Sequence, residues 1–172
     1  MSYAIVTRGL TKYYGLRPVV HALDLRIPTG CVYGFLGRNG AGKSTTIKML
    51  TGMVHPSSGT AELLGEPVQS LSAATRQRIC YLAEGHPLYR WMTIDGLERL
   101  ARPCYPAWDA ALFGQIIEHF ELPRRVRIRK FSNGQRAQVS LALAVAPDPE
   151  LLILDDPTLG LDTVVRRDFL ES

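Results

Sequence analysis

Apolar and polar positions along the chain follow two periods, and the shorter period dominates the first thirty residues. Residues 3–7 and 22–27 alternate between apolar and polar side chains. The second segment places Leu23, Leu25 and Ile27 on one face. This alternation predicts two antiparallel strands, each with one face exposed to solvent.

Other strands are predicted from short apolar runs. Residues 31–36 (CVYGFL) and 151–154 (LLIL) are almost continuously apolar, which is typical of strands buried on both faces. Residues 60–64 follow a turn at 56–59 and predict another short strand. Residues 78–82 (RICYL) predict a further one.

Helical periodicity governs the middle of the chain. From residue 84 to about 130 the pattern predicts short helices separated by prolines, with Thr93 as an N-cap. Ser132 is expected to cap a helix that runs to about residue 146, and a last helix is expected over 164–170. Strands that alternate with helices indicate an α/β fold with a helical insert.

Composition narrows the class of protein. The chain has 172 residues, of which 46% are hydrophobic and 21% charged, as expected for one globular domain. Three widely spaced cysteines argue against a zinc site or a disulfide framework. We find no signal sequence and no apolar stretch of bilayer length, so an intracellular, soluble chain is expected. The net charge of +4 permits an anionic ligand or a lipid surface and does not demand nucleic acid.

A glycine-rich segment carries the strongest chemical signal. Residues 37–44 (GRNGAGKS) match the pattern GxxxxGK[ST] between a predicted strand and a predicted helix, and Gly52 is placed to end that helix. Glycines let successive backbone N–H groups point at a polyphosphate, Lys43 neutralises its oxygens, and the Ser44 hydroxyl ligates Mg²⁺. The alternative is a glycine turn with an exposed lysine. We predict a nucleotide site.

A carboxylate follows the second buried run. Asp155 comes directly after residues 151–154, where the end of a parallel strand faces the ligand crevice of an α/β sheet. A carboxylate there can hold Mg²⁺, often through water.

Three motifs together resemble a known family. The segments LGRNGAGKST, FSNGQ and LLILDDPTLGLD, in this order and spacing, resemble the ATP-binding cassette of ABC transporters. The similarity is greatest to cassettes that pair with a separate ABC-2-type exporter permease. It implies an α/β fold: a P-loop NTPase core with a parallel sheet flanked by helices, N-terminal antiparallel strands and a helical insert. The implied domain is 1–172, with a core over 1–83, the insert and signature helix over 84–146, and the second motif over 147–172.

The resemblance also implies site residues. Tyr14 would stack on adenine, although a tyrosine that packs in the core is the alternative. Asp156 stands where the family has a catalytic Glu, and Glu84 where it has a Gln that ligates Mg²⁺ and contacts the permease. Gly160, Leu161 and Asp162 match a loop that crosses between two subunits. The residues that would bind the phosphates are Gly37, Asn39, Gly40, Ala41, Gly42, Lys43, Ser44 and Thr45. The residues that would bind the metal are Ser44, Glu84 and Asp155. The signature residues, which would bind the γ-phosphate held by a second subunit, are Ser132, Asn133, Gly134 and Gln135.

The implied function is ATP binding and hydrolysis coupled to export, as the nucleotide-binding subunit of an ABC transporter. Its cofactors are ATP and Mg²⁺, and its partners are a second cassette, in a homodimer, and a transmembrane permease, without nucleic acid. The expected location is the cytoplasmic face of the cell membrane. The alternative is a regulatory or non-transport cassette with weak or no hydrolysis, because Asp156 has one methylene less reach than Glu.

One departure from the family concerns the sheet. In the family another strand follows the second motif and ends near a histidine that contacts the γ-phosphate, whereas this sequence continues only ten residues past Asp162. Without that strand, we expect a gap in the middle of the sheet and poor folding or weak ATP binding.

Two further surface features leave alternatives open. Residues 124–130 (RRVRIRK) alternate so that Arg125, Arg127 and Arg129 share a side, which favours a solvated face over a nucleic-acid patch. Trp91 is either a partner-binding anchor or a core residue.

Overall fold

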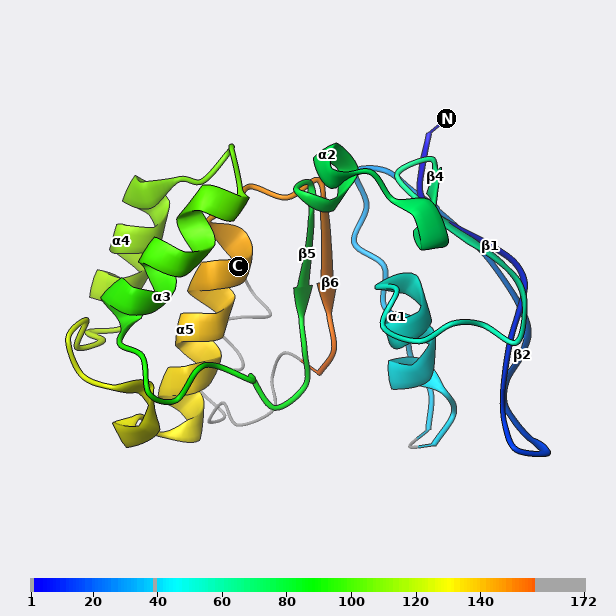
Figure 1. The fold of residues 1–172 in the computed structure, drawn as a ribbon, viewed down its shortest axis with the longest axis horizontal. Coiled ribbons are helices and arrows are strands. Elements are labelled where there is room, and N and C mark those ends of the chain that lie inside the picture. Colours follow the sequence, from blue (N-terminus) through cyan, green and yellow to red (C-terminus); the bar gives the residue numbers. More distant parts are fainter. Residues whose placement is uncertain (1, 39, 157–172) are drawn as a thin grey trace. The chain divides into compact units, whose positions relative to one another are not determined.

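The computed structural model describes residues 2–38 and 40–156. The chain divides into two compact units, an N-terminal unit (Met1–Arg76) and a C-terminal unit (Gln77–Ser172), each described by itself (Figure 1). Together they contain antiparallel strands, a parallel strand pair and helices, so the predicted α/β class is confirmed.

An antiparallel sheet forms most of the N-terminal unit. Strand β1 (Tyr3–Tyr14) pairs with β2 (Arg17–Pro28) and with β3 (Ser58–Leu63), which pairs in turn with β4 (Glu66–Pro67). The two predicted N-terminal strands are confirmed and are longer than predicted. They extend to a two-residue turn in which Gly15 has a φ of 61°, a conformation that such hairpin turns require.

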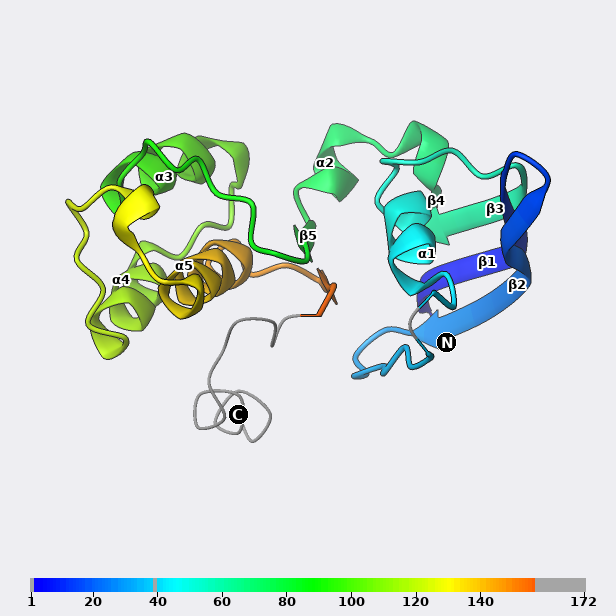
Figure 2. The same cartoon turned by 90° about the horizontal axis from the view of Figure 1, so that it is seen from below.

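Helix α1 (Lys43–Leu50) packs against β2 and β3 (Figure 2). It buries Ile47, Met49 and Leu50. Gly52 ends it with a φ of 74°, and the N–H of Met53 donates to the carbonyl of Lys48 at 2.9 Å. This is a Schellman ending, and it confirms the predicted role of Gly52. The unit ends with a 3₁₀ turn, η1 (Val68–Ser70), and helix α2 (Ala73–Arg76).

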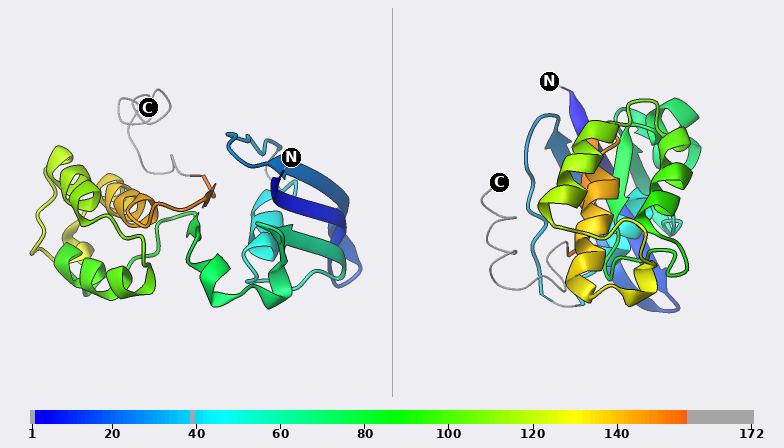
Figure 3. Two further views of the ribbon diagram at one scale, coloured as in Figure 1. Left: turned by 90° about the horizontal axis from the view of Figure 1, so that it is seen from above. Right: turned by 90° about the vertical axis from the view of Figure 1, so that its left-hand side faces the viewer.

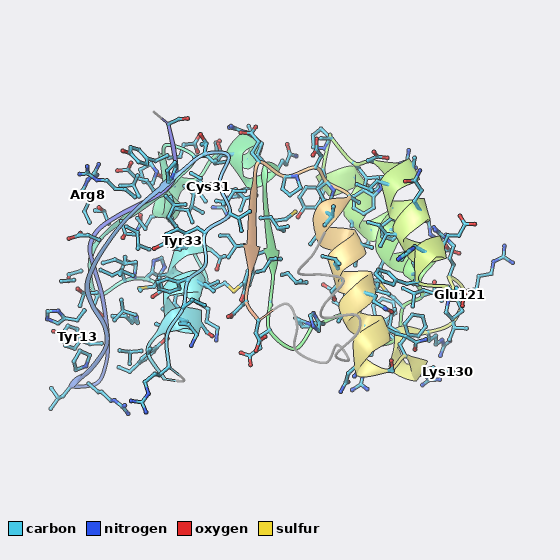
Figure 4. The ribbon with its side chains drawn as sticks, turned by 180° about the vertical axis from the view of Figure 1, so that it is seen from behind. Arg8, Tyr13, Cys31, Tyr33, Glu121 and Lys130 are labelled. Carbon is cyan, nitrogen blue, oxygen red and sulfur yellow. The ribbon has the colours of Figure 1, made fainter. Side chains whose placement is uncertain are left out.

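The predicted strand at residues 31–36 is wrong. This segment has no strand conformation, and the side chains of Val32 and Leu36 are fully exposed. Figure 4 labels Cys31 and Tyr33 along it. A strand buried on both faces needs ladder partners, and within the described part of this unit no strand pairs with the segment. An apolar run alone therefore does not form a strand here.

The C-terminal unit contains two parallel strands. Strand β5 (Ile79–Leu82) pairs with β6 (Leu151–Leu154) in register from Ile79 with Leu151 to Leu82 with Leu154. Both strands were predicted, but the expected complete burial of 151–154 is wrong. Only Ile153 is buried, and Leu152 is 37% exposed, because β6 has β5 as its one partner among the described residues.

Three helices form the core of this unit. Helices α3 (Ile94–Ala101) and α4 (Ala110–His119) pack against α5 (Asn133–Val145) (Figure 3). Two 3₁₀ turns, η2 (Arg102–Cys104) and η3 (Ile128–Lys130), lie between them in sequence. The side chains of Phe113, Ile94 and Val139 are fully buried in this core. The predicted helix at 164–170 lies outside the described residues.

The helix N-caps follow the sequence prediction. The hydroxyl of Thr93 accepts from the N–H of Gly96 at 3.1 Å, and the hydroxyl of Ser132 accepts from the N–H of Gln135 at 3.1 Å. Both predicted caps are confirmed. Each satisfies a backbone donor that the first helical turn leaves without a partner.

Candidate functional site

The glycine-rich loop has a backbone conformation that favours glycine. Gly40 and Gly42 have φ values of 82° and 88°, and Gly42 is the N-cap of α1. A Cβ on Gly42 would lie 2.5 Å from the carbonyl oxygen of Val19, which is closer than atoms approach. The loop therefore needs glycine at this position both for its backbone angle and for its contact with β2.

Lys43 folds back over this loop. Its Nζ donates to the carbonyl oxygens of Gly37 at 2.6 Å and Arg38 at 3.1 Å. The N–H of Ala41 also donates to the Arg38 carbonyl, at 3.1 Å, which closes the turn. Within residues 2–38 and 40–156 no carboxylate forms an ion pair with Lys43. The ammonium is therefore held at the loop with its charge available to an anion.

The start of α1 adds to this positive potential. The helix has no acidic residue in its first turn, and no side chain caps it. Its first N–H groups and its dipole therefore favour an anion at the loop. Ser44 and Thr45 lie in this first turn, whereas Asn39 lies outside the described residues.

A second cluster lies at the carboxyl ends of the two parallel strands. Asp155 is buried directly after β6, and its N–H donates to the carbonyl of Leu82 at 2.9 Å. The Tyr81 hydroxyl donates to Oδ2 of Asp155 at 3.5 Å. Burial raises the pKa of Tyr81 above its usual value, and the charges of Asp155 and Glu84 raise it further. Asp155 and Glu84, two of the three predicted metal ligands, therefore both raise the pKa of the Tyr81 hydroxyl.

The donor set of this cluster fits Mg²⁺. Carboxylates are hard oxygen ligands, and Mg²⁺ is usually held in proteins by one or two of them together with waters and phosphates. Among the described residues no group of three or more His, Cys, Asp or Glu side chains could enclose a metal ion. The carboxylates of Asp155 and Glu84 supply oxygen ligands of the kind that Mg²⁺ prefers.

Tyr81 was not predicted from the sequence as a site residue. A tyrosine within a short apolar strand resembles any core residue, and its link to Asp155 depends on the parallel pairing of β5 with β6. The signal that points to it is its place in β5, three residues before Glu84.

The signature residues form the start of α5. Ser132 and Gln135 make a capping box, in which each side chain bonds to the backbone N–H of the other. Arg136 donates to the Phe131 carbonyl at 2.7 Å and to the Asn133 side chain. These bonds fix the helix start rigidly. The side chains of Ser132 and Asn133 are exposed there.

Tyr14 lies at the end of β1, beside the hairpin turn. Its side chain is 53% exposed, so the core-packing alternative is wrong. The Nζ of Lys12 lies 5.4 Å from the centre of its ring, a cation–π contact. The neighbouring Tyr13 is labelled at the same end of the strand in Figure 4. An exposed ring is available for stacking.

Asp156 follows the second cluster in an unusual conformation. It is exposed and has a φ of 49°, a region that few residues other than Gly, Asn and Asp adopt. The extended conformation of β6, which ends at Leu154, therefore does not continue through Asp156. Gly160, Leu161 and Asp162 lie outside the described residues.

Comparison with known proteins places this geometry in a family. The family profile described as "ABC transporter" matches residues 20–159, most of the chain. The chain belongs to the ABC transporter family. This cassette is 37% identical over 165 residues to the Nod factor export ATP-binding protein I of Burkholderia orbicola, covering 93% of this chain and 54% of that protein. It is 38% identical over 169 residues to the daunorubicin/doxorubicin resistance ATP-binding protein DrrA of Streptomyces peucetius, covering 95% and 51%. The cassette thus spans about half the length of the curated relatives it matches.

Solved structures agree with this assignment. The cassette aligns with a structure titled "Structure of ATP binding subunit of ABC transporter" at a TM-score of 0.83 and 29% identity, over 98% of this chain and 72% of that one. A dimeric post-hydrolysis ATP-binding cassette bound to ADP and Pi aligns at a TM-score of 0.82, over 97% and 80%. Its 19% identity supports the fold alone. Within the described residues of this cassette, no helix is both long and apolar enough to span a bilayer.

Proposed function

We propose that this cassette binds MgATP on residues 37–45 and hydrolyses it, as the nucleotide-binding subunit of an exporter. The observation that carries the proposal is the loop itself, in which Gly42 leaves no room for a side chain and Lys43 is held over the loop carbonyls. An anion with several negative oxygens matches both the ammonium and the N–H groups of α1.

Individual residues take defined roles in this proposal. Lys43 exchanges its bonds with the loop carbonyls for bonds with the β- and γ-phosphate oxygens. The Ser44 hydroxyl would hold Mg²⁺ at the loop, where the ion would neutralise charge on the phosphates, and the carboxylates of Asp155 and Glu84 are oxygen ligands of the kind that Mg²⁺ prefers. Tyr14 offers its exposed ring to adenine.

Asp156 would accept the proton of the water that attacks the γ-phosphate. Its carboxylate is exposed, and Asp156 directly follows Asp155, the predicted metal ligand. A base at this position in the sequence would lie next to the metal ligand. Asp has the charge that this role requires and one methylene less reach than Glu. We expect a working but slow hydrolysis.

The partners follow from the same reasoning. The exposed side chains of Ser132 and Asn133, at a helix start fixed by a capping box, suit a γ-phosphate held by a second copy of this cassette. Nucleotide would then join the two copies, and hydrolysis would release them. The relatives' names, Nod factor export and daunorubicin/doxorubicin resistance, favour an exporter of the ABC-2 type, with a permease as membrane partner and a cytoplasmic, membrane-peripheral location.

Phosphate release from MgATP tests the catalytic role of Asp156. Asp156→Asn keeps the size and removes the base, so release should fall by about a hundredfold. Asp156→Glu restores the base with a longer reach and should release phosphate at least as fast as the unaltered chain. Nucleotide binding should be unchanged in both variants, which serves as the control for folding.

The opposite outcome identifies the alternative function. If the unaltered chain binds ATP and releases no phosphate, whereas Asp156→Glu does release it, then the cassette is a nucleotide-binding module without turnover. If Asp156→Asn releases phosphate as fast as the unaltered chain, Asp156 is not the base.

A further inference from the structure

Lys12 lies on β1 two residues before Tyr14, and two contacts hold its ammonium group. Its Nζ donates to the carbonyl oxygen of His55 at 2.6 Å and lies 5.4 Å from the centre of the Tyr14 ring. The side chain is half-buried, and within residues 2–38 and 40–156 it forms no ion pair with a carboxylate. The ammonium therefore joins the segment around His55 to the aromatic ring of Tyr14.

The segment around His55 also holds the backbone of this end of β1. The N–H of Tyr13 donates to the hydroxyl of Ser57 at 3.0 Å, and the N–H of Ser57 donates to the carbonyl of Thr11 at 2.8 Å. This segment follows α1 in the chain, and the N-cap of α1 belongs to the glycine-rich loop. The strand end that carries Tyr14 is therefore fixed to the chain that leaves the phosphate-loop helix.

The glycine-rich loop meets the sheet at the position of Lys12. Val20 on β2 pairs with Lys12 on β1, and a Cβ on Gly42 would lie 3.0 Å from Cγ2 of Val20. Tyr14 is two residues further along β1, and two residues of a strand advance about 7 Å. A nucleotide with its phosphates on the loop can thus extend its base along β1 toward the Tyr14 ring.

The contact with Lys12 leaves one face of the Tyr14 ring for a ligand. The ring is 53% exposed, and the ammonium is placed over the other face. A cation over a ring is attracted to it and restricts its rotation. A ring that is restricted before a ligand arrives loses less entropy when the ligand stacks on it.

We propose that Lys12 is a positioning residue for the base of the nucleotide: it holds the Tyr14 ring so that the open face stacks on adenine. The inference rests on the proposed function and deepens it, because it names a residue that favours a nucleotide over a bare polyphosphate. Lys12 acts on the base through Tyr14, whereas Lys43 acts on the phosphates directly.

Calorimetric titration of the full chain with two magnesium-bound ligands tests the proposal. One ligand is ATP, and the other is tripolyphosphate, which has three phosphates and no base. Lys12→Met keeps the length of the side chain and removes the ammonium, so its affinity for ATP should fall about fivefold. Its affinity for tripolyphosphate should be unchanged. Lys12→Arg should restore ATP affinity to within about twofold, because a guanidinium can donate to a carbonyl and stack on a tyrosine ring.

A double-mutant cycle shows whether Lys12 acts through Tyr14. Tyr14→Ala removes the ring and should weaken ATP binding about tenfold. Adding Lys12→Met to Tyr14→Ala should then cost little more, since the ring that it positions is gone. A fivefold loss that is the same with and without the ring would overturn the proposal.

The matched control removes a cation from the same strand. Arg8 pairs with Glu62 at 2.8 Å on the surface of β1, so Arg8→Met should bind both ligands as the unaltered chain does. If Lys12→Met weakens tripolyphosphate binding as much as ATP binding, then Lys12 acts on the phosphates by its charge and the proposal is wrong. Unchanged ATP affinity in Lys12→Met would overturn it and leave the proposed function standing. No saturable binding of ATP to the unaltered chain would overturn both.

Discussion

At the scale of single residues, the phosphate loop depends on the close approach of Gly42 to the Val19 carbonyl. Gly42→Ala would place a methyl group 2.5 Å from the Val19 carbonyl at a φ of 88°. We expect loss of nucleotide binding and a fall of about 2 kcal/mol or more in the free energy of unfolding, from the combined clash and backbone strain. Calorimetry and binding of a fluorescent ATP analogue measure both.

Gly40→Ala is the matched control. Gly40 has a similar φ of 82°, and nothing lies within 4 Å of its Cβ position. It should therefore show the backbone strain alone, about 1 kcal/mol. If the two variants lose equal stability, then the approach of the loop to β2 does not determine the requirement for glycine.

The ionisation of Tyr105 makes the free energy of unfolding depend on pH in the alkaline range. Burial, together with a hydrogen bond to the Cys80 sulfur, raises the pKa of Tyr105 to about 12. The unfolded chain releases this proton near pH 10, whereas the folded chain keeps it. The resulting stability is present below pH 10 and is lost as the pH rises through 12.

Tyr105→Phe removes this titration. Between pH 10 and 12 the midpoint of urea unfolding should fall more steeply for the unaltered chain than for the variant. Identical slopes would mean that the proton of Tyr105 is not held by the fold.

At the scale of elements, helix ends determine where the signature residues lie. Ser132→Ala removes one half of the capping box of α5 and should lower the free energy of unfolding by about 1 kcal/mol. Ser132→Asp can still cap the helix, so its stability should stay near that of the unaltered chain. Its added negative charge would repel a γ-phosphate and should lower phosphate release, provided that Ser132 binds it.

Elements with local signals were predictable from the sequence. Thr93 and Ser132 cap helices because a hydroxyl beside free N–H groups works in any context. Gly52 ends α1 for an equally local reason. The exposed course of residues 31–36 was not predictable from the sequence, because a buried strand depends on partners from distant parts of the chain. Tyr81 was not predictable for the same reason, because its hydrogen bond with Asp155 depends on the pairing of β5 with the distant strand β6.

At the scale of the whole molecule, chemistry is divided between two units. The loop with Lys43 belongs to the N-terminal unit, and Asp155, Glu84 and the signature residues belong to the C-terminal unit. The motifs predict each part from the sequence, since each is a contiguous segment. The pairing of Thr93 with Arg127 required the structure, because the two residues lie more than thirty positions apart in the sequence.

Binding of MgATP to the chain and to Lys43→Ala tests the central claim most directly. Lys48→Ala, an exposed lysine on the same helix, is the control. We expect weak but saturable binding to the unaltered chain and to Lys48→Ala, and at least tenfold weaker binding to Lys43→Ala, because one charge-assisted contact with phosphate contributes about 1.5–3 kcal/mol. Equal affinity in all three, or no saturable binding to the unaltered chain, would contradict the assignment of residues 37–45 as the nucleotide site.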